Sequence, residues 1–380
     1  MGLRASLFLV LWASSSGLSF AKAVLPIVGS HHHDVIIASA SLTDHDRLDP
    51  YANDGRPRSI MVSSFYPITQ CRRRKIESYM PPATASFMDT KFGAYGLPNG
   101  SFQSLGLETC MTPAKRGACS NGSLPVVLFS GALGTSRHLY NAMLQNIAAA
   151  GYLVLSIDHP YDADMVEFPD GTIVTGVEID SDAEIESALN TRVADIEFVS
   201  KQMYNVSASK ELFPGYMRTQ SVSKMAVVGH SFGGAAAASA MMKMTSLRGG
   251  VNLDGSMFGS VLITGFDGPF MLMGHENKTQ ETDPSWKTIW PRLTGWKKEL
   301  EVKNTAHYSF SDLPLVISAL GLDGKLPAEV GELLGSIEGR RMTNLTTTYV
   351  AAFLDMVLKE GKEGAFFKAG EQFSEVSDVA

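Results

Sequence analysis

The sequence predicts an α/β fold in which a mostly parallel sheet is covered by helices on both faces. From about residue 126 onward, short apolar runs alternate with segments that have helical character, and such alternation is typical of parallel strands joined by helices. One apolar run, Lys224–Gly229, leads into Gly-His-Ser-Phe-Gly at 229–233 and then into a run of helix-forming residues. A serine between two glycines at a strand-to-helix turn is typical of a nucleophile elbow.

The predicted elements follow in order along the chain. Val35–Leu42 and Ile60–Tyr66, joined by a polar turn rich in Asp, Arg and Pro, predict an antiparallel opening to the sheet. The alternation then runs through strand Val126–Phe129, helix Ser136–Ala150, strand Tyr152–Ile157, helix Ala183–Tyr204, the elbow strand and its helix Gly233–Met244, strands Gly250–Leu253 and Pro269–Met273, a last strand Leu300–Lys303 and helix Tyr349–Leu358.

The 380 residues are expected to form a single domain over residues 24–380, because α/β folds of this size often have one core. Residues 1–23 have the pattern of a secretory signal peptide, with Arg4 before an apolar core and Ala21-Lys22-Ala23 as the cleavage site. No later run approaches the roughly 20 apolar residues of a membrane span. We therefore expect a soluble protein that is secreted.

Other sequence features agree with export. In an oxidising compartment, three cysteines predict one disulfide and one free thiol, and we expect Cys110 to pair with Cys119 and leave Cys71 over. We expect at least two sequons to be glycosylated. The net charge of −7 argues against a nucleic-acid partner. The sequons are at Asn99, Asn121, Asn205, Asn277 and Asn344.

The segment Thr69–Gly122 interrupts the alternation with Pro, Gly, aromatic residues and all three cysteines. A loop of this length without structure is unusual in a compact domain unless it has a function. We expect a cap that covers the site and shapes substrate access. A surface excursion held by a disulfide is the alternative interpretation.

Ser231 is the expected nucleophile, and a serine hydroxyl needs a histidine base that is oriented by a carboxylate. Where the serine sits on such an elbow, the acid and the histidine follow it in the chain, and only His275 and His307 lie beyond Ser231. We expect His307 to be the base, because it follows the last predicted strand in a loop that can carry it over the strand ends. His275, which also follows a predicted strand, is the alternative.

Asp254 is the expected acid, because it ends the run 250–253 and its carboxylate would emerge at the same sheet edge as Ser231. Asp267 and Asp283 are the alternative acids. The non-catalytic alternative for Asp254 is that it caps the turn beside Gly255. The oxyanion hole is expected to use the N–H of Phe232, which follows the nucleophile, and the N–H of Leu133 in the loop after strand 126–129.

The chain resembles the secreted, plasma-type platelet-activating factor acetylhydrolases, also called lipoprotein-associated phospholipase A2, and their microbial relatives. The resemblance extends from about Leu42 to Leu358 and implies the α/β-hydrolase fold, Ser231, Asp254 and His307 as the triad, Leu133 and Phe232 as the oxyanion hole, and no metal or other cofactor. The chain departs from the family at Gly131, where a histidine is common, and in its cysteine-bearing insertion. The matching stretches are FSGALG at Phe129–Gly134, GHSFGG at Gly229–Gly234, NLDG at Asn252–Gly255, HYSFSD at His307–Asp312 and, as in microbial members, IDHPYDAD at Ile157–Asp164.

Several weaker signals have simpler interpretations. His31-His32-His33 lacks the spacing of a metal site, and His159 precedes Ser231, so we assign it to loop scaffolding. Arg72–Lys75 could meet an anionic lipid surface, but charge runs are usually solvated. Three tryptophans could insert into a lipid interface, although we expect them to pack in the core. They are Trp286, Trp290 and Trp296.

The function expected from these features is that of a secreted serine esterase. If the resemblance extends to substrate, it favours short or oxidised sn-2 acyl chains of phospholipids. A carboxylesterase, lipase or polyester hydrolase of broader specificity is the alternative within the same chemistry. A non-catalytic binding glycoprotein on a hydrolase fold is the alternative of another class, since fold alone does not imply activity.

Overall fold

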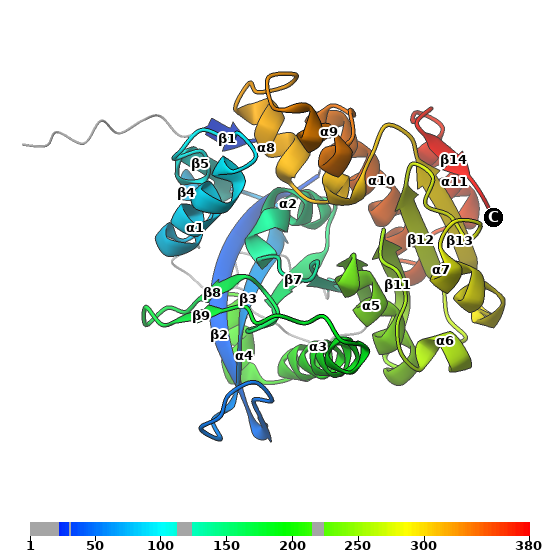
Figure 1. Cartoon of the computed structure of the whole chain (residues 1–380), viewed down its shortest axis with the longest axis horizontal. Coiled ribbons are helices and arrows are strands. Elements are labelled where there is room, and N and C mark those ends of the chain that lie inside the picture. The colour runs from blue at the N-terminus through cyan, green and yellow to red at the C-terminus, as the bar shows by residue number, and fades with distance from the viewer. Residues whose placement is uncertain (1–22, 30–31, 112–123, 215–223) are drawn as a thin grey trace, which may run out of the picture.

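A nine-stranded sheet forms the centre of the protein in the computed structural model, which describes residues 23–29, 32–111, 124–214 and 224–380 (Figure 1). Six neighbouring strands, from β13 to β7, are parallel, and antiparallel strands complete both edges. The predicted α/β fold is therefore confirmed. In spatial order the strands are β14 (Val376–Asp378), β13 (Lys297–Val302), β12 (Phe270–His275), β11 (Leu247–Leu253), β10 (Met225–His230), β6 (Val126–Ser130), β7 (Leu153–Asp158), β3 (Pro57–Ile68) and β2 (Asp34–Leu48).

Helices cover both faces of this sheet, and each face has its own apolar core. Alternate residues of β6 illustrate the division: Val127 and Phe129 pack into one core, whereas Val126 and Leu128 pack into the other, as the two-residue period of a strand requires. The first core receives α1 (Pro82–Gly93), α2 (Asn141–Ala149), α8 (Leu313–Ala319), α9 (Ala328–Leu334), α10 (Gly339–Leu358) and α11 (Glu363–Gly370), and the second receives α3 (Asp182–Gln202), α4 (Val206–Leu212), α5 (Phe232–Lys243), α6 (Val261–Thr264) and α7 (Pro284–Ile289).

The structure corrects the predicted order at several points. The predicted last strand, 300–303, corresponds to β13. It is not the last strand, because β14 follows it in the chain and pairs with it antiparallel at the edge of the sheet. The predicted terminal helix begins ten residues earlier, at Gly339, and the strands at 35–42 and 60–66 are parts of the longer β2 and β3. The helices α1, α4, α6, α7, α8, α9 and α11 were not predicted, nor was a small hairpin of β8 (Met165–Glu167) and β9 (Ile173–Thr175).

The described part of the insertion Thr69–Gly122 is a structured layer rather than a loop. β4 (Arg74–Ser78) and β5 (Leu105–Cys110) pair with the N-terminal β1 (Ala23–Leu25) in a three-stranded sheet, and α1 packs beside it (Figure 1). A short 3₁₀ helix, Phe102–Ser104, leads into β5. The remainder of the insertion, 112–122, lies outside the described residues, as do the expected signal peptide up to residue 22, Cys119 and Asn121.

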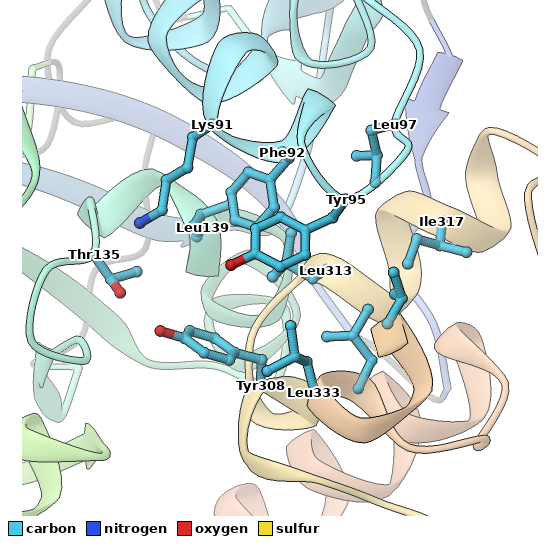
Figure 2. A pocket seen from close by; sticks show the side chains of 12 residues that line it. Lys91, Phe92, Tyr95, Leu97, Thr135, Leu139, Tyr308, Leu313, Ile317 and Leu333 are labelled. Carbon is cyan, nitrogen blue, oxygen red and sulfur yellow. The ribbon is translucent and has the colours of Figure 1, made fainter. Parts of the chain in front are cut away.

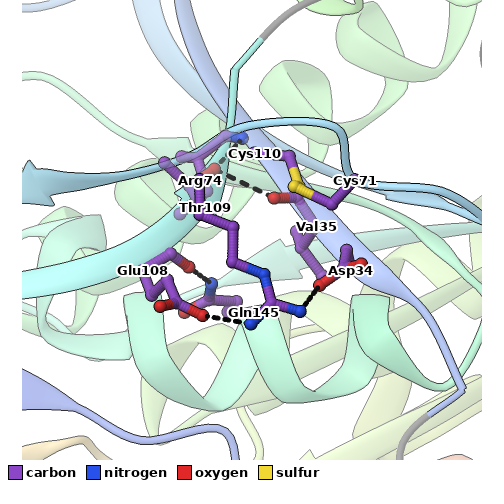
Figure 3. Close-up of a disulfide and its surroundings, with 9 residues drawn as sticks. Asp34, Val35, Cys71, Arg74, Glu108, Thr109, Cys110 and Gln145 are labelled. Carbon is purple, nitrogen blue, oxygen red and sulfur yellow. Dashed lines mark hydrogen bonds and ion pairs between the residues drawn. A yellow bond between two sulfur atoms is a disulfide. The ribbon is translucent and has the colours of Figure 1, made fainter.

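The expected pairing of Cys110 with Cys119 is wrong in this structure, where Cys110 is bonded to Cys71 (Figure 3). Antiparallel pairing of β4 with β5 places Arg74 opposite Cys110, and Cys71 lies just before β4. The two Cα atoms are consequently 5.7 Å apart, which is within the ordinary range for a disulfide. The sequence alone did not reveal these two short strands, so it could not bring Cys71 close to Cys110.

The tryptophans and the basic run that suggested lipid contact differ in how far they are buried. Trp286 is wholly buried, and its indole Nε1 donates to the Gly255 carbonyl at 2.7 Å, so core packing is confirmed for this residue. Trp296 packs against Phe353 and Phe366, whereas the run 72–75 is exposed. Within the described residues, no helix is both long and apolar enough to cross a bilayer.

Candidate active site

Ser231 occupies a sharp turn between β10 and α5. Its φ of 57° and ψ of −122° are unusual for a residue with a side chain and store local strain. A Cβ on Gly229 would lie 2.0 Å from the Gly233 carbonyl oxygen, and a Cβ on Gly233 would lie 2.0 Å from the Ser130 carbonyl oxygen. The two glycines are therefore required for this turn, as the elbow motif predicted.

The structure brings Ser231, His307 and Asp254 together. Ser231 Oγ donates to His307 Nε2 at 2.9 Å, and His307 Nδ1 donates to Asp254 Oδ2 at 2.5 Å. Asp254 follows β11 with a left-handed φ of 61°, and His307 opens the 3₁₀ helix His307–Phe310 after β13. The residues predicted as nucleophile, base and acid thus form one hydrogen-bonded chain at the carboxyl ends of the parallel strands.

Asp254 is fully buried but ionised. Burial alone would raise its pKa, yet hydrogen bonds from His275 and His307 outweigh this effect and hold the pKa at about 2. The carboxylate can therefore hold His307 in the tautomer whose Nε2 accepts the serine proton.

His275, the alternative base, lies on the other side of the same carboxylate. Its backbone N–H donates to Asp254 Oδ1 at 2.8 Å, and its Nδ1 lies 2.7 Å from Oδ1 and 2.8 Å from Oδ2. The alternative acids are occupied elsewhere: Asp283 bonds with Lys278 and caps α7, and Asp267 accepts from Thr294. In the described chain, Asp254 is therefore the carboxylate that contacts His307.

His230 and Tyr140 support the site and were not assigned from the sequence. Ala132 N–H donates to Tyr140 Oη at 3.0 Å, and Tyr140 Oη lies 2.8 Å from His230 Nδ1. His230 Nε2 in turn donates to the His307 carbonyl at 2.9 Å. Burial, with a smaller effect of His307, lowers the pKa of His230 to about 3, so the ring is neutral and can accept on one nitrogen while donating on the other. The only sequence signal was the position of His230 inside the elbow motif.

Residues 130–134, at the end of β6 and just after it, are called the oxyanion loop because they include Leu133. This loop packs directly against the elbow, since a Cβ on Gly233 would meet the carbonyls of Ser130 and Gly131. Phe232 is the first residue of α5, so its N–H has no carbonyl partner within the helix. Leu133 is partly exposed, and in the described chain its N–H has no hydrogen-bond acceptor. Both predicted oxyanion donors are therefore free to bind an anion.

His159 is separate from this chain of hydrogen bonds. It is buried, its Nδ1 lies 2.9 Å from Asp195 Oδ2, and its Nε2 lies 3.0 Å from Ser130 Oγ. Burial lowers its pKa, so the ring is neutral. These contacts agree with the scaffolding role expected from its place in the sequence.

An apolar pocket lies beside Tyr308, the residue after His307, and between the insertion and helices α8 and α9 (Figure 2). Its cavity volume is ≈ 80 Å³. Phe92 and Tyr95 of the insertion form one wall. Tyr308 and Thr135, the residue after the oxyanion loop, also line the pocket. The remaining lining residues are Lys91, Leu97, Leu139, Leu313, Ile317, Val330, Leu333 and Leu334.

Comparison with known proteins finds relatives along most of the chain. Residues 50–167 and 181–369 match the family described as platelet-activating factor acetylhydrolase, isoform II. A protein of Arthroderma benhamiae named "Probable 1-alkyl-2-acetylglycerophosphocholine esterase" is 32% identical over 358 residues, which cover 88% of this chain and 88% of that protein.

A solved structure is also similar. The ferulic acid esterase from Streptomyces cinnamoneus has a TM-score of 0.76 and 26% sequence identity, and the match covers 95% of this chain and 100% of the esterase. An esterase thus shares nearly the whole architecture described above.

Proposed function

Since this chain belongs to the family of platelet-activating factor acetylhydrolase, isoform II, we propose that it is a secreted serine esterase that removes short or oxidised acyl chains from the sn-2 position of phospholipids. The chain is a carboxylic ester hydrolase. The single observation that carries the serine mechanism is the continuous series of hydrogen bonds from Asp254 through His307 to Ser231.

The reaction begins when Ser231 Oγ attacks the ester carbonyl carbon and His307 Nε2 accepts the serine proton. The carbonyl oxygen becomes an anion that the N–H groups of Leu133 and Phe232 bind. His307 then gives its proton to the departing alcohol oxygen, which leaves an acyl-serine. Water attacks this acyl-enzyme with His307 again as the base, and the carboxylic acid and free Ser231 are released.

The apolar pocket next to Tyr308 supports a lipid acyl group as the substrate. Apolar side chains form most of its lining, so the pocket suits a hydrocarbon chain. The relative from Arthroderma benhamiae, whose name refers to a 2-acetyl lipid, supports the same substrate class.

A second candidate substrate is an aromatic ester. Phe92, Tyr95 and Tyr308 present three rings to the pocket, and aromatic groups pack well against one another. The similarity to a ferulic acid esterase supports this candidate, which belongs to the broader carboxylesterase class.

One assay separates the two substrates. The purified protein is incubated with 1-alkyl-2-acetyl-glycerophosphocholine, with phosphatidylcholine that has two long chains, and with methyl ferulate, and the released acid is measured. We expect hydrolysis of the acetyl lipid and little hydrolysis of the long-chain lipid. Faster hydrolysis of methyl ferulate would move the assignment to aromatic esters, and Ser231→Ala is the control for each substrate.

Export is the remaining part of the proposal. The pattern of residues 1–23 supports cleavage near Val24, and Asn99, Asn205 and Asn277 are exposed sequon residues in the described chain. Asn344, in contrast, lies partly buried within α10. N-terminal sequencing of protein from culture medium, and its mass before and after removal of N-glycans, test both points.

A further inference from the structure

A buried arginine lies directly beneath the oxyanion loop. Arg192 extends from α3 and is 2% exposed. We infer that Arg192 is a positioning residue of the oxyanion hole, which holds the loop in the conformation that turns the Leu133 N–H toward the reacting carbonyl. This inference rests on the proposed serine mechanism.

Arg192 binds three consecutive residues at the start of the loop. Its Nη1 donates to the Gly131 carbonyl and, at 3.0 Å, to Ser130 Oγ, and its Nη2 donates to the Ala132 carbonyl at 3.2 Å. No other side chain in the described structure donates to two carbonyls of this loop. The guanidinium therefore determines which way these two peptide groups face.

The orientation of the Leu133 N–H follows from peptide geometry. In a planar trans peptide, the carbonyl of one residue and the N–H of the next point in opposite directions. Because the Ala132 carbonyl points at the buried guanidinium, the Leu133 N–H points away from the protein interior. Leu133 is partly exposed whereas Arg192 is buried, so this N–H faces the accessible side of the loop.

Arg192 is itself held by a carboxylate that also binds the loop. Asp162 accepts from Arg192 Nε at 2.7 Å and from Nη2 at its second oxygen. The backbone carbonyl of Asp162 accepts from Gly134 N–H at 3.0 Å. One residue thus fixes both the guanidinium and the far end of the loop, which limits the movement of Leu133 between them.

The same guanidinium contacts the residue that supplies the second oxyanion donor. Its Cζ lies 4.9 Å from the centre of the Phe232 ring, within the range of a cation–π contact. Ser130, at the start of the loop, is held from a different direction by the neutral His159. Arg192 therefore lies between the two halves of the expected hole.

Only an arginine can make this set of contacts. The planar guanidinium offers five donors in a fixed arrangement, whereas a lysine ammonium is a point charge with three donors. Arg192→Lys therefore keeps a positive charge near Asp162 but cannot hold Asp162, Ser130 and two carbonyls together.

The test compares Arg192→Lys with Arg137→Lys. Arg137 is also 2% exposed and binds one aspartate, Asp158, but it does not contact the carbonyls of residues 131–134 in the described structure. We expect Arg192→Lys to lower kcat for a p-nitrophenyl ester by about tenfold to a hundredfold, below the 10²–10³ that loss of a whole donor costs, with KM nearly unchanged. Arg137→Lys should keep kcat within about twofold if it folds.

A thionoester provides a readout that a general loss of stability would not change. In a thionoester, sulfur replaces the carbonyl oxygen and accepts hydrogen bonds from the N–H donors poorly. The preference for the oxygen ester, which is the ratio of its rate to the rate on the matching thionoester, therefore reports how well the oxyanion hole is formed. We expect this preference to fall in Arg192→Lys and to remain in Arg137→Lys. Asp162→Asn, which weakens the hold on Arg192 with an isosteric side chain, should show a smaller fall in the same direction.

Two results would overturn the inference. One is a folded Arg192→Lys enzyme, or Asp162→Asn if the lysine variant does not fold, with normal kcat and a normal ester-to-thionoester preference. The other is an equal loss in Arg137→Lys. Failure of the serine mechanism is a separate result, because it would appear as activity that survives Ser231→Ala.

Discussion

At the residue scale, the unusual feature of the site is one buried carboxylate with two histidines. Asp254 receives His307 on one oxygen, whereas His275 binds it through both its ring and its backbone N–H. Of the two, His307 is the one whose other ring nitrogen meets Ser231 Oγ. The two histidines should therefore differ sharply in their effect on catalysis.

We predict that His307→Ala lowers kcat/KM as much as Ser231→Ala does, by about 10⁴-fold or more, because each removes a member of one catalytic unit. His275→Ala should keep most of the activity, because Asp254 still receives His307. Rates of p-nitrophenyl acetate hydrolysis by the two folded variants give the ranking. The reverse ranking would move the base to His275.

The core of the candidate site could be predicted from the sequence because chemistry fixes its residue types and their order. Glycines flank Ser231 for steric reasons, and only two histidines follow it. The supporting residues could not be predicted in this way. Arg192 lies on α3, 39 residues before Ser231, and only the packing of α3 brings it to the oxyanion loop. Tyr140 ends the 3₁₀ helix Arg137–Tyr140 close to this loop in the chain, but the His230 ring that it contacts is 90 residues away.

At the scale of elements, the insertion is fixed to the rest of the protein at both ends of α1. Glu167 accepts from the Thr84 N–H at 2.9 Å, and Lys91 Nζ lies 2.6 Å from Asp164 Oδ2. Lys91 also contacts the Gly134 carbonyl at 3.4 Å. The wall of the pocket that Phe92 and Tyr95 provide is therefore attached to the segment next to the oxyanion loop.

We predict that Phe92→Ala combined with Tyr95→Ala changes acyl selectivity. Loss of two rings enlarges the pocket, so the ratio of hexanoate to acetate hydrolysis should rise by about tenfold, the scale of one or two methylenes in an apolar pocket. The acetate rate should change little. Ile263→Ala, which alters a side chain that is 79% exposed on α6, is the control. An unchanged ratio in the double variant would show that the insertion does not shape the acyl pocket.

The disulfide provides a second prediction at this scale. The Cys71–Cys110 bond closes a separation of 39 residues and joins β5 to the chain that enters β4, where Arg74 pairs with Asp34 and Glu108 (Figure 3). Cys71→Ser should lower the free energy of unfolding by about 2–4 kcal/mol, whereas Cys119→Ser should leave it unchanged. Urea unfolding measures both, and a peptide map that finds Cys110 bonded to Cys119 would contradict the structure.

The secondary structure was predictable where its signals are local. The parallel strands are short apolar runs between helices, so their positions were found within a few residues. β4, β5 and β14 are short strands whose pairing depends on partners far away in the chain. No element was predicted from the sequence in the stretch that contains α8 and α9. The predicted cysteine pairing was wrong for the same reason, because the Cys71–Cys110 bond depends on the pairing of β4 with β5.

At the scale of the whole molecule, buried ionisable groups make stability depend on pH. Burial lowers the pKa of three histidines, including His230 to about 3, and the pKa of Asp254 is held at about 2. Between the folded and unfolded pKa values of each such group, the unfolded chain binds more protons. Stability therefore falls as the pH falls through this window. Three acids act in the opposite direction, because burial raises the pKa of Asp164, of Glu299 and, to about 7, of Asp312. Groups with lowered pKa values are more numerous, since Asp195 and Asp283 also belong to them.

We predict that the melting temperature decreases steadily from pH 7 to pH 4, mainly because the buried histidines, whose ordinary pKa is 6.5, must be protonated as the chain unfolds. Circular dichroism melts across this range provide the measurement. His230→Asn should flatten the dependence, because it removes one of the three groups. A melting temperature that is constant or rises toward pH 4 would contradict the prediction.

The account as a whole depends on Ser231 as the nucleophile, and covalent labelling tests this most directly. The protein is treated with a fluorophosphonate, digested, and the modified residue is located by mass spectrometry, with Ser231→Ala in parallel. We predict a single adduct on Ser231, no adduct in the variant, and a loss of ester hydrolysis of about 10⁴-fold or more in the variant. An adduct on another residue, or hydrolysis that persists in Ser231→Ala, would contradict the account.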